Sequence, residues 1–170
     1  MAKKLLVLCM AAIMAVAALV AGCGSDQKAA SDSKVLKVGT NADFAPFEFQ
    51  DENGKEYQGF DMDLIRAIGE EMGYKVEISN IKFDGLIPAI QAGNIDVAIT
   101  GMTINEERKQ NVLFSDPYYK SGLSIIVAKD NNDIKTFQDL KGKKVAVQIG
   151  TTSAAEVNKI GGVEVKEFIS

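Results

Sequence analysis

The hydrophobic positions after residue 34 follow two periods that alternate along the chain. Strand-like segments, which alternate or form short apolar runs, are residues 35–40, 75–81 and 95–100. Segments with apolar residues at helical spacing are 59–72 and 83–90. Glycines end both predicted helices, at Gly73 and Gly93. The order of strand, helix, strand, helix and strand is typical of an α/β domain with a largely parallel sheet.

The residues between the first strand and the first helix are rich in aromatic side chains. Residues 41–49 hold three phenylalanines around Pro46 and are predicted to form a loop, whose rings either pack on the core or line a cleft. Residues 50–58 contain a hairpin-like turn. Asp61 and Asp63 are interpreted as a helix cap and a first-turn acid rather than as paired catalytic carboxylates, and Asp84 as the cap of the next helix.

The pattern changes after residue 109. Residues 114–119 form an aromatic-rich turn, and the apolar run 122–129 is predicted to be a strand that crosses between two lobes. A second α/β pattern follows. Its predicted elements are a helical turn at 136–140, a strand at 143–148, a loop at 150–153, a helix at 154–160 and a strand at 163–168.

The stretch from Thr100 to Arg108 joins a predicted strand to a predicted helix start. Asn105 is a favourable N-cap, and the two glutamates that follow it suit the positive end of the helix dipole. Arg108 opposes that field. Together with free N–H groups of the first turn, its guanidinium would form a receptor for a carboxylate or a phosphate. The alternative is a solvated surface arginine.

The N-terminal residues resemble an export signal. Lys3 and Lys4 precede an apolar run at 5–21, and residues 20–23, Val-Ala-Gly-Cys, match a lipobox that is cut before its cysteine. We therefore predict a lipoprotein signal peptide at 1–22, lipid on Cys23 and a flexible tether at 23–34. An uncleaved membrane anchor is the alternative.

Composition narrows the possible functions. The chain has no histidine, which removes the usual near-neutral proton shuttle and the commonest transition-metal ligand. Without Lys3 and Lys4, 17 of the 19 basic residues face 23 acidic ones, a net charge of −6 that disfavours nucleic acid as a partner. No metal, cofactor or catalytic residue is predicted.

Two strand-to-helix loops are expected to meet at a cleft for a small zwitterion. The hydroxyl of Thr103, the guanidinium of Arg108 and the N–H groups of Thr151 and Thr152 could share a carboxylate. An ordinary helix N-cap is the alternative interpretation of residues 150–153.

These motifs resemble a known family. The segments GTNADFAPFEF, GFDMDL, FDGLIPAIQAGNIDVAITGMTINEERK, FSDPYYKSG and VQIGTTS are similar, in this order, to the bacterial extracellular solute-binding proteins that deliver polar amino acids to ABC importers. The resemblance implies a type II periplasmic-binding-protein-like α/β fold, a Venus flytrap of two lobes with mixed sheets. The first lobe would span 35–124 and the second 125–170.

The resemblance also implies residue roles. Arg108 would bind the ligand's carboxylate with help from Thr103 and Thr152, and the Gly101 carbonyl and the Thr103 hydroxyl would meet the ammonium. Aromatic walls would come from Phe44 and Phe83, and side-chain polarity would be read at Asn41 and Gln148. The predicted ligand-binding set is Asn41, Phe44, Phe83, Gly101, Met102, Thr103, Arg108, Gln148, Thr151 and Thr152.

The chain departs from the family in two respects. Many relatives have aspartate where this chain has Asn41, so a charge contact with a cationic side chain is absent or comes from elsewhere. Relatives also continue past Ser170, so the resemblance implies an N-terminal fragment with an incomplete second lobe and no return to the first.

The expected function is capture of a polar amino acid outside the cytoplasm, with basic or amide side chains favoured. The protein would be a monomer that delivers its ligand to an ABC permease from the outer face of the cytoplasmic membrane or in the periplasm. The alternatives are a ligand-sensing domain of a receptor and an enzyme, a dehydratase, on the same fold.

Overall fold

The computed structural model describes residues 34–169. The predicted signal peptide, Cys23 and all of the predicted tether except Lys34 lie outside the described residues. The first sheet has three parallel strands in the order β5-β1-β6. They are β1 (Lys34–Thr40), β5 (Tyr74–Asn80) and β6 (Val97–Ala98). The central strand β1 is paired with β5 from Lys34↔Tyr74 to Thr40↔Asn80, which confirms the predicted parallel α/β arrangement.

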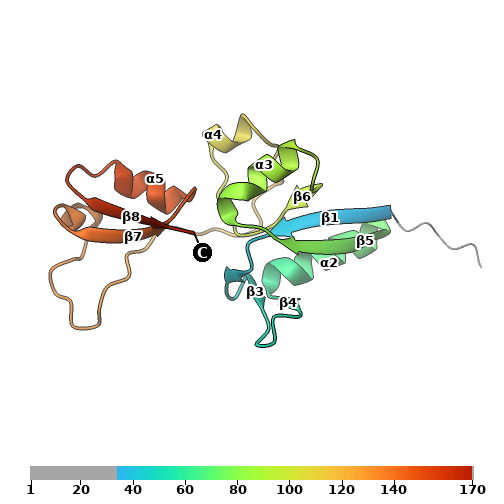
Figure 1. The fold of residues 1–170 in the computed structure, drawn as a ribbon, viewed down its shortest axis with the longest axis horizontal. Coiled ribbons are helices and arrows are strands. Elements are labelled where there is room, and N and C mark those ends of the chain that lie inside the picture. The colour runs from blue at the N-terminus through green and yellow to red at the C-terminus, as the bar shows by residue number, and fades with distance from the viewer. Residues whose placement is uncertain (1–33, 170) are drawn as a thin grey trace, which may run out of the picture. The chain divides into compact units, whose positions relative to one another are not determined.

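Two helices pack on this sheet, on opposite sides of the β1 and β5 strands in Figure 1. They are α2 (Phe60–Met72) and α3 (Leu86–Gln91), and the short η1 turn (Phe83–Gly85) leads into α3. The first core cluster consists of Val38, Met62, Ile65 and Ile99, all at most 8% exposed. Met62 and Ile65 of α2 thus meet Val38 of β1, with Leu36 and Leu64 packed beside them. The predicted repeat of Leu64, Ile68 and Met72 is only partly buried, because Ile68 and Met72 are 39% and 57% exposed.

An antiparallel sheet occupies residues that the sequence predicts as a loop and a turn. Its strands are β2 (Asp43–Phe44), β3 (Glu48–Gln50) and β4 (Tyr57–Gln58), in the order β2-β3-β4. The Ala45–Pro46 peptide bond between β2 and β3 is cis. The ring of Phe47 contacts Phe44, Phe60 and Tyr119, with centroids 5.8, 6.3 and 4.9 Å apart. The ring of Phe47 therefore packs the β2–β3 segment against the start of α2 and against Tyr119.

The prediction of a strand at 122–129 is wrong. Residues 112–128 contain no helix or strand, and the side chain of Ile126 is 96% exposed. A β-strand needs a neighbour for its N–H and C=O groups, and no strand of the described part of the chain pairs with this segment. An apolar composition is therefore not sufficient to make residues 122–129 a strand.

A second core cluster lies beyond this segment, in residues 134–168. Parallel strands β7 (Lys144–Gln148) and β8 (Glu164–Phe168) pair in register from Lys144↔Glu164 to Gln148↔Phe168. Two further elements cover them, η2 (Phe137–Leu140) and α5 (Thr152–Asn158). The buried members are Leu140, Val147, Ala154 and Val157. The elements predicted for this region are therefore confirmed to within two residues at each boundary.

The short α4 helix (Glu106–Lys109) follows β6. Asn105 is its N-cap and accepts a hydrogen bond from the N–H of Arg108, as predicted. Between residues 34 and 169, none of the helices combines the length and the apolar character that crossing a bilayer requires.

Candidate functional site

The guanidinium of Arg108 lies at the centre of the candidate site. Arg108 is 8% exposed, so the alternative of a solvated surface arginine is wrong for this structure. Its Nη1 donates to the Thr103 carbonyl oxygen at 2.7 Å, and its Nη2 donates to the Gly150 carbonyl oxygen at 3.0 Å. A residue in the first turn of α4 is thereby bonded to both strand-to-helix loops.

The surroundings of Arg108 combine an aromatic ring with burial. The Cζ atom of Arg108 lies 5.4 Å from the ring centroid of Phe83, a cation–π geometry. Burial lowers the pKa of Arg108 below its ordinary value, and the nearby Glu107 carboxylate partly opposes that change. A guanidinium remains charged after such a shift and still favours an anionic partner.

The loop after β6 carries three predicted site residues, Gly101, Met102 and Thr103. Gly101 has a φ of +54°, a left-handed conformation that favours glycine, and its N–H donates to the Asp61 Oδ2 at 2.9 Å. Met102 is half-buried. The Thr103 Oγ1 lies 3.5 Å from the Thr152 Oγ1, at the outer limit of a hydrogen bond. The two threonines predicted to help Arg108 are therefore neighbours.

The loop after β7 has a similar local design. Gly150 has a φ of +75°. Thr151 is the N-cap of α5, because its Oγ1 accepts from the N–H of Ala154 at 3.2 Å, and its hydroxyl donates to the Gln148 carbonyl oxygen at 2.7 Å. The N-cap interpretation of residues 150–153 is thus confirmed, and the carbonyl of Gly150 also reaches Arg108.

The two predicted specificity residues contact each other. The Nε2 of Gln148 donates to the Oδ1 of Asn41 at 2.7 Å, and the Nδ2 of Asn41 donates to the Oδ2 of Asp43 at 3.1 Å. Asn41 is 3% exposed at the end of β1. The Asp43 carboxylate, two residues along the chain, thus lies beside the amide of Asn41.

Phe44 is the most exposed of the predicted aromatic residues. Its ring is 56% exposed and stacks on Phe47. It also lies 3.5 Å from the position that a Cβ atom on Gly101 would occupy. Phe44 therefore borders the Gly101 loop, whereas Phe83 contacts Arg108 itself.

Two helix-cap predictions are wrong. The N-cap of α2 is Gly59, and Asp61 makes no capping bond; it is completely buried and accepts from the Gly101 N–H and the Tyr118 hydroxyl. The N-caps of η1 and α3 are Lys82 and Gly85, so Asp84 is not a cap. Asp61 is buried because the first turn of α2 faces the loop after β6.

Sequence reasoning missed Glu48, which is 1% exposed on β3. Its Oε1 accepts from the Thr100 hydroxyl at 2.9 Å, and burial raises the pKa of its carboxyl to about 8. The available signal is its place between Phe47 and Phe49, since alternation on a strand puts Glu48 on the opposite face from both rings.

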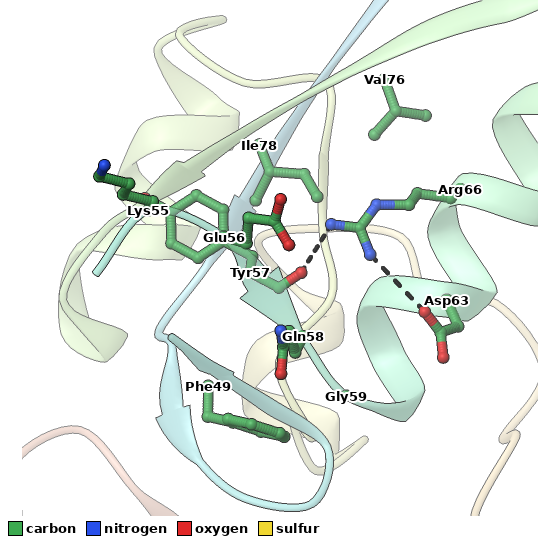
Figure 2. A pocket seen from close by; sticks show the side chains of 10 residues that line it. All are labelled: Phe49, Lys55, Glu56, Tyr57, Gln58, Gly59, Asp63, Arg66, Val76 and Ile78. Carbon is green, nitrogen blue, oxygen red and sulfur yellow. Dashed lines mark hydrogen bonds and ion pairs between the residues drawn. The ribbon is translucent and has the colours of Figure 1, made fainter. Parts of the chain in front are cut away.

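A separate hollow lies elsewhere on the surface, and the residues that line it include none of the predicted ligand-binding residues. It has a volume of about 790 Å³ and is lined by residues of the β3–β4 hairpin, α2 and β5. Figure 2 shows Arg66 there with its guanidinium bonded to the Tyr57 carbonyl oxygen and paired with Asp63. Arg66 is half-exposed and already paired with the Asp63 carboxylate, whereas the buried Arg108 bonds two neutral carbonyl oxygens, so Arg108 is the better anion receptor.

The chain matches the family model described as bacterial extracellular solute-binding proteins, family 3, over residues 36–165. The match covers more than half of the chain, so the chain belongs to this family. The arginine-binding extracellular protein ArtP of Bacillus subtilis is 39% identical over 150 residues, which cover 88% of this chain and 57% of ArtP. The chain thus spans less than two thirds of the length of this relative.

Solved structures agree with this assignment. An ancestral arginine-binding protein bound to arginine is 55% identical with a TM-score of 0.77, covering 79% of this chain and 60% of that one. An ancestral amino acid-binding protein, described as a precursor of cyclohexadienyl dehydratase, is 48% identical with a TM-score of 0.75 and the same coverage. The predicted type II periplasmic-binding-protein fold is therefore confirmed.

Proposed function

We propose, from this family membership, that the whole protein is the binding component of an ABC importer for a polar amino acid. The observation that carries the proposal is the buried guanidinium of Arg108, held between the Thr103 and Gly150 carbonyl oxygens. Two lobes, at 35–124 and 125–170 with further residues of the whole protein, would close on the ligand and exclude water from it.

The ligand's carboxylate would bind Arg108. A guanidinium has five N–H donors, so its two bonds to carbonyl oxygens do not exhaust them. The Thr103 and Thr152 hydroxyls lie together and can add neutral hydrogen bonds to the same carboxylate. The Gly101 carbonyl and the Thr103 hydroxyl would accept from the ammonium, with Met102 and Thr151 completing the two loops.

A basic or amide side chain is the preferred ligand class. Asn41 and Gln148 offer amide groups, and the Asp43 carboxylate that accepts from Asn41 supplies negative charge beside them. The rings of Phe44 and Phe83 would enclose the aliphatic part of the ligand. Similarity to arginine-binding proteins supports the same class.

The N-terminal residues would retain the exported protein at the membrane. Residues 1–22 would act as the signal peptide, Cys23 would carry the lipid, and residues 23–34 would be the tether. The protein would then work as a monomer beside its permease, on the outer face of the cytoplasmic membrane or in the periplasm. The charged, apolar and small-residue regions of the sequence support this assignment.

An enzyme on the same fold is the second candidate, favoured by similarity to the described dehydratase precursor. Glu48 has the raised pKa of a general acid, but at 1% exposure it does not contact the space beside Arg108. We therefore prefer binding without reaction. Turnover of a bound ligand, followed by chromatography, would reverse that preference.

Calorimetric titration of the whole protein with L-arginine tests the binding proposal. Arg108→Ala should weaken binding by roughly 10- to 150-fold, which corresponds to about 1.5 to 3 kcal/mol for a charged hydrogen-bond partner. Arg66→Ala is the matched control, because Arg66 is the other arginine of the chain and lies in the separate hollow of Figure 2. Equal affinity in the Arg108 variant and the parent would refute the assignment.

A further inference from the structure

Two carboxyl groups are buried together behind the candidate site. Glu48 on β3 is 1% exposed and Asp61 in the first turn of α2 is completely buried. Asp61 is near enough to Glu48 that its charge and the hydrogen bond its side chain could share with Glu48 both raise the pKa of Glu48. The guanidinium of Arg108 donates instead to the Thr103 and Gly150 carbonyl oxygens. The carboxyl pair therefore does not serve to balance the charge of Arg108.

Hydrogen bonds connect this pair to the ends of β1 and β6. The Thr100 hydroxyl donates to Glu48 Oε1 at 2.9 Å and accepts from the Asn41 N–H at 3.0 Å. Asp61 Oδ2 accepts from the Gly101 N–H at 2.9 Å. The carboxyl pair thus fixes two backbone N–H groups that lie beside predicted ligand-binding side chains and carbonyls.

A single proton would satisfy the remaining atoms of the pair. Among the residues that the structure describes, Glu48 Oε2 and Asp61 Oδ1 are buried without a hydrogen-bond partner. Two adjacent buried carboxylates do not both ionise readily, because each charge disfavours the other. Asp61 also accepts from the Tyr118 hydroxyl at 2.8 Å, so it has two donors where Glu48 has one. The proton of the pair is therefore better placed on Glu48.

We infer that Glu48 is a positioning residue, a neutral acid that donates a hydrogen bond to Asp61 and thereby holds the strand ends at Asn41 and Gly101 in their binding geometry. The consequence for ligand affinity rests on the proposed function. The consequence for the two backbone N–H groups does not, because their bonds are present without any ligand.

The titration of Glu48 depends on its burial and on the groups that face it. Burial raises the pKa of Glu48 to about 8, the Thr100 hydroxyl opposes this, and the Asp61 and Asp43 charges add to it. Burial, and then the bond to Asp61, raise the pKa of the Tyr118 hydroxyl above its ordinary value, so Tyr118 stays protonated near pH 8. The chain has no histidine that would titrate in the same range.

The sign of the pH effect follows from the raised pKa. Between the ordinary value of 4.5 and about 8, the folded protein holds a proton that the unfolded chain has lost. The free energy of unfolding should therefore fall as pH rises through this range. Above it, Glu48 becomes charged in the folded protein, and the bond between the two carboxyl groups is lost.

Nuclear magnetic resonance on the chain tests the inference directly. The Glu48 carboxyl carbon should titrate near pH 8 in the unaltered chain, which needs no variant to fold. Exchange protection of the Gly101 and Asn41 amides should fall by about tenfold between pH 7 and 9, after correction for intrinsic exchange. Glu48→Gln, which keeps a donor to Asp61, should abolish that pH dependence, whereas the exposed control Glu52→Gln should retain it.

The result that would overturn the inference is a Glu48 carboxyl that titrates near 4.5, or a Glu48→Gln chain with the same pH dependence as the parent. Calorimetry of the whole protein with L-arginine at pH 6 and 8.5 then tests the link to binding. Affinity should fall with pH more in the parent than in Glu48→Gln, while the titration of L-arginine itself is common to both. Failure of both proteins to bind L-arginine would count against the proposed ligand, and the magnetic resonance result would still decide the role of Glu48.

Discussion

The loop after β6 and the loop after β7 share a local design but differ in their support. Each has a glycine with positive φ, Gly101 and Gly150, and each ends at a side chain that caps the following helix, Asn105 and Thr151. The first loop is also bonded from behind by the buried Asp61. The second is bonded through the Gly150 carbonyl to Arg108, a residue of the first loop's helix.

This difference indicates a division of roles. The first loop is fixed by residues of its own neighbourhood, the three-stranded sheet and α2, and can hold Arg108 in place by itself. The second loop contributes the Gly150 carbonyl, which accepts from Arg108, and the Thr152 hydroxyl, which lies beside Thr103 of the first loop. The comparison predicts that changes near the first loop affect both loops, whereas changes near the second remain local.

The largest expected effect comes from the cores beneath the two loops. Met62→Ala and Leu140→Ala should each cost about 2 to 5 kcal/mol of unfolding free energy, because each removes a side chain at most 3% exposed. The two core clusters share no residue. Amide exchange should therefore show Met62→Ala lowering protection at Val38, and Leu140→Ala lowering it at Val147.

A control for this comparison is an exposed apolar side chain. Ile126→Ala should leave the unfolding free energy within about 0.5 kcal/mol of the parent, since Ile126 is 96% exposed. If Leu140→Ala lowered protection at Val38 as much as at Val147, a change near the second loop would not remain local, and the division of roles between the loops would be wrong.

The next effect concerns the two glycines. A left-handed conformation costs a non-glycine residue about 1 to 2 kcal/mol, so Gly101→Ala and Gly150→Ala should both be destabilising. Gly150→Ala should cost more, because its new Cβ would lie 3.2 Å from the Cβ and 3.4 Å from the Cα of Asp84. A Cβ on Gly101 would meet ring atoms of Phe44 at 3.5 Å and Glu48 Oε1 at 3.9 Å, both ordinary contact distances. Urea unfolding measures both.

Gly161→Ala is the control, because a Cβ there meets nothing within 4 Å and Gly161 is not among the positive-φ glycines. It should be neutral or slightly stabilising. A Gly150→Ala chain as stable as the Gly161→Ala chain would mean that the Gly150 loop is free to move away from Asp84, and that its bond to Arg108 is weak.

Local signals in the sequence predicted the helix cap after the first loop and the strands and helix that support this loop. Asn105 was identified as an N-cap from the chemistry of a helix start, which depends on four consecutive residues and their unpaired N–H groups. The strands β1 and β5 and the helix α2 were predicted from periodicity, since each carries apolar residues at a regular spacing in sequence. Such features are encoded within a short stretch.

The supporting contacts were not encoded locally. Asp61 has the sequence position of a cap, and only the approach of Gly101, forty residues later, makes it a buried acceptor. Glu48 and Thr100 are likewise brought together from positions 52 residues apart. The run at 122–129 has strand composition but no strand beside it in the described residues. Partners distant in sequence decide each case, and one sequence does not reveal them.

The smallest expected effect concerns the helix caps, and it tests the comparison most finely. Asn105→Ala and Thr151→Ala should each cost about 1 kcal/mol of unfolding free energy, because each removes an acceptor for a helix N–H. Asn105→Asp and Thr151→Ser keep that acceptor and should lose much less. Thermal unfolding of the four variants measures these differences, and equal losses for the alanine and the conservative variants would rule out capping as the cause.

The same four variants separate the two loops by their effect on binding. Asn105 bonds the N–H of Arg108 itself at 2.8 Å, so its loss should move the guanidinium and weaken L-arginine binding by the whole protein in the calorimeter. Thr151 bonds Ala154 at 3.2 Å and the Gln148 carbonyl, and neither bond includes Arg108. Thr151→Ala should therefore reduce stability with a smaller loss of affinity, and a larger loss of affinity than Asn105→Ala would reverse the assigned order of the two loops.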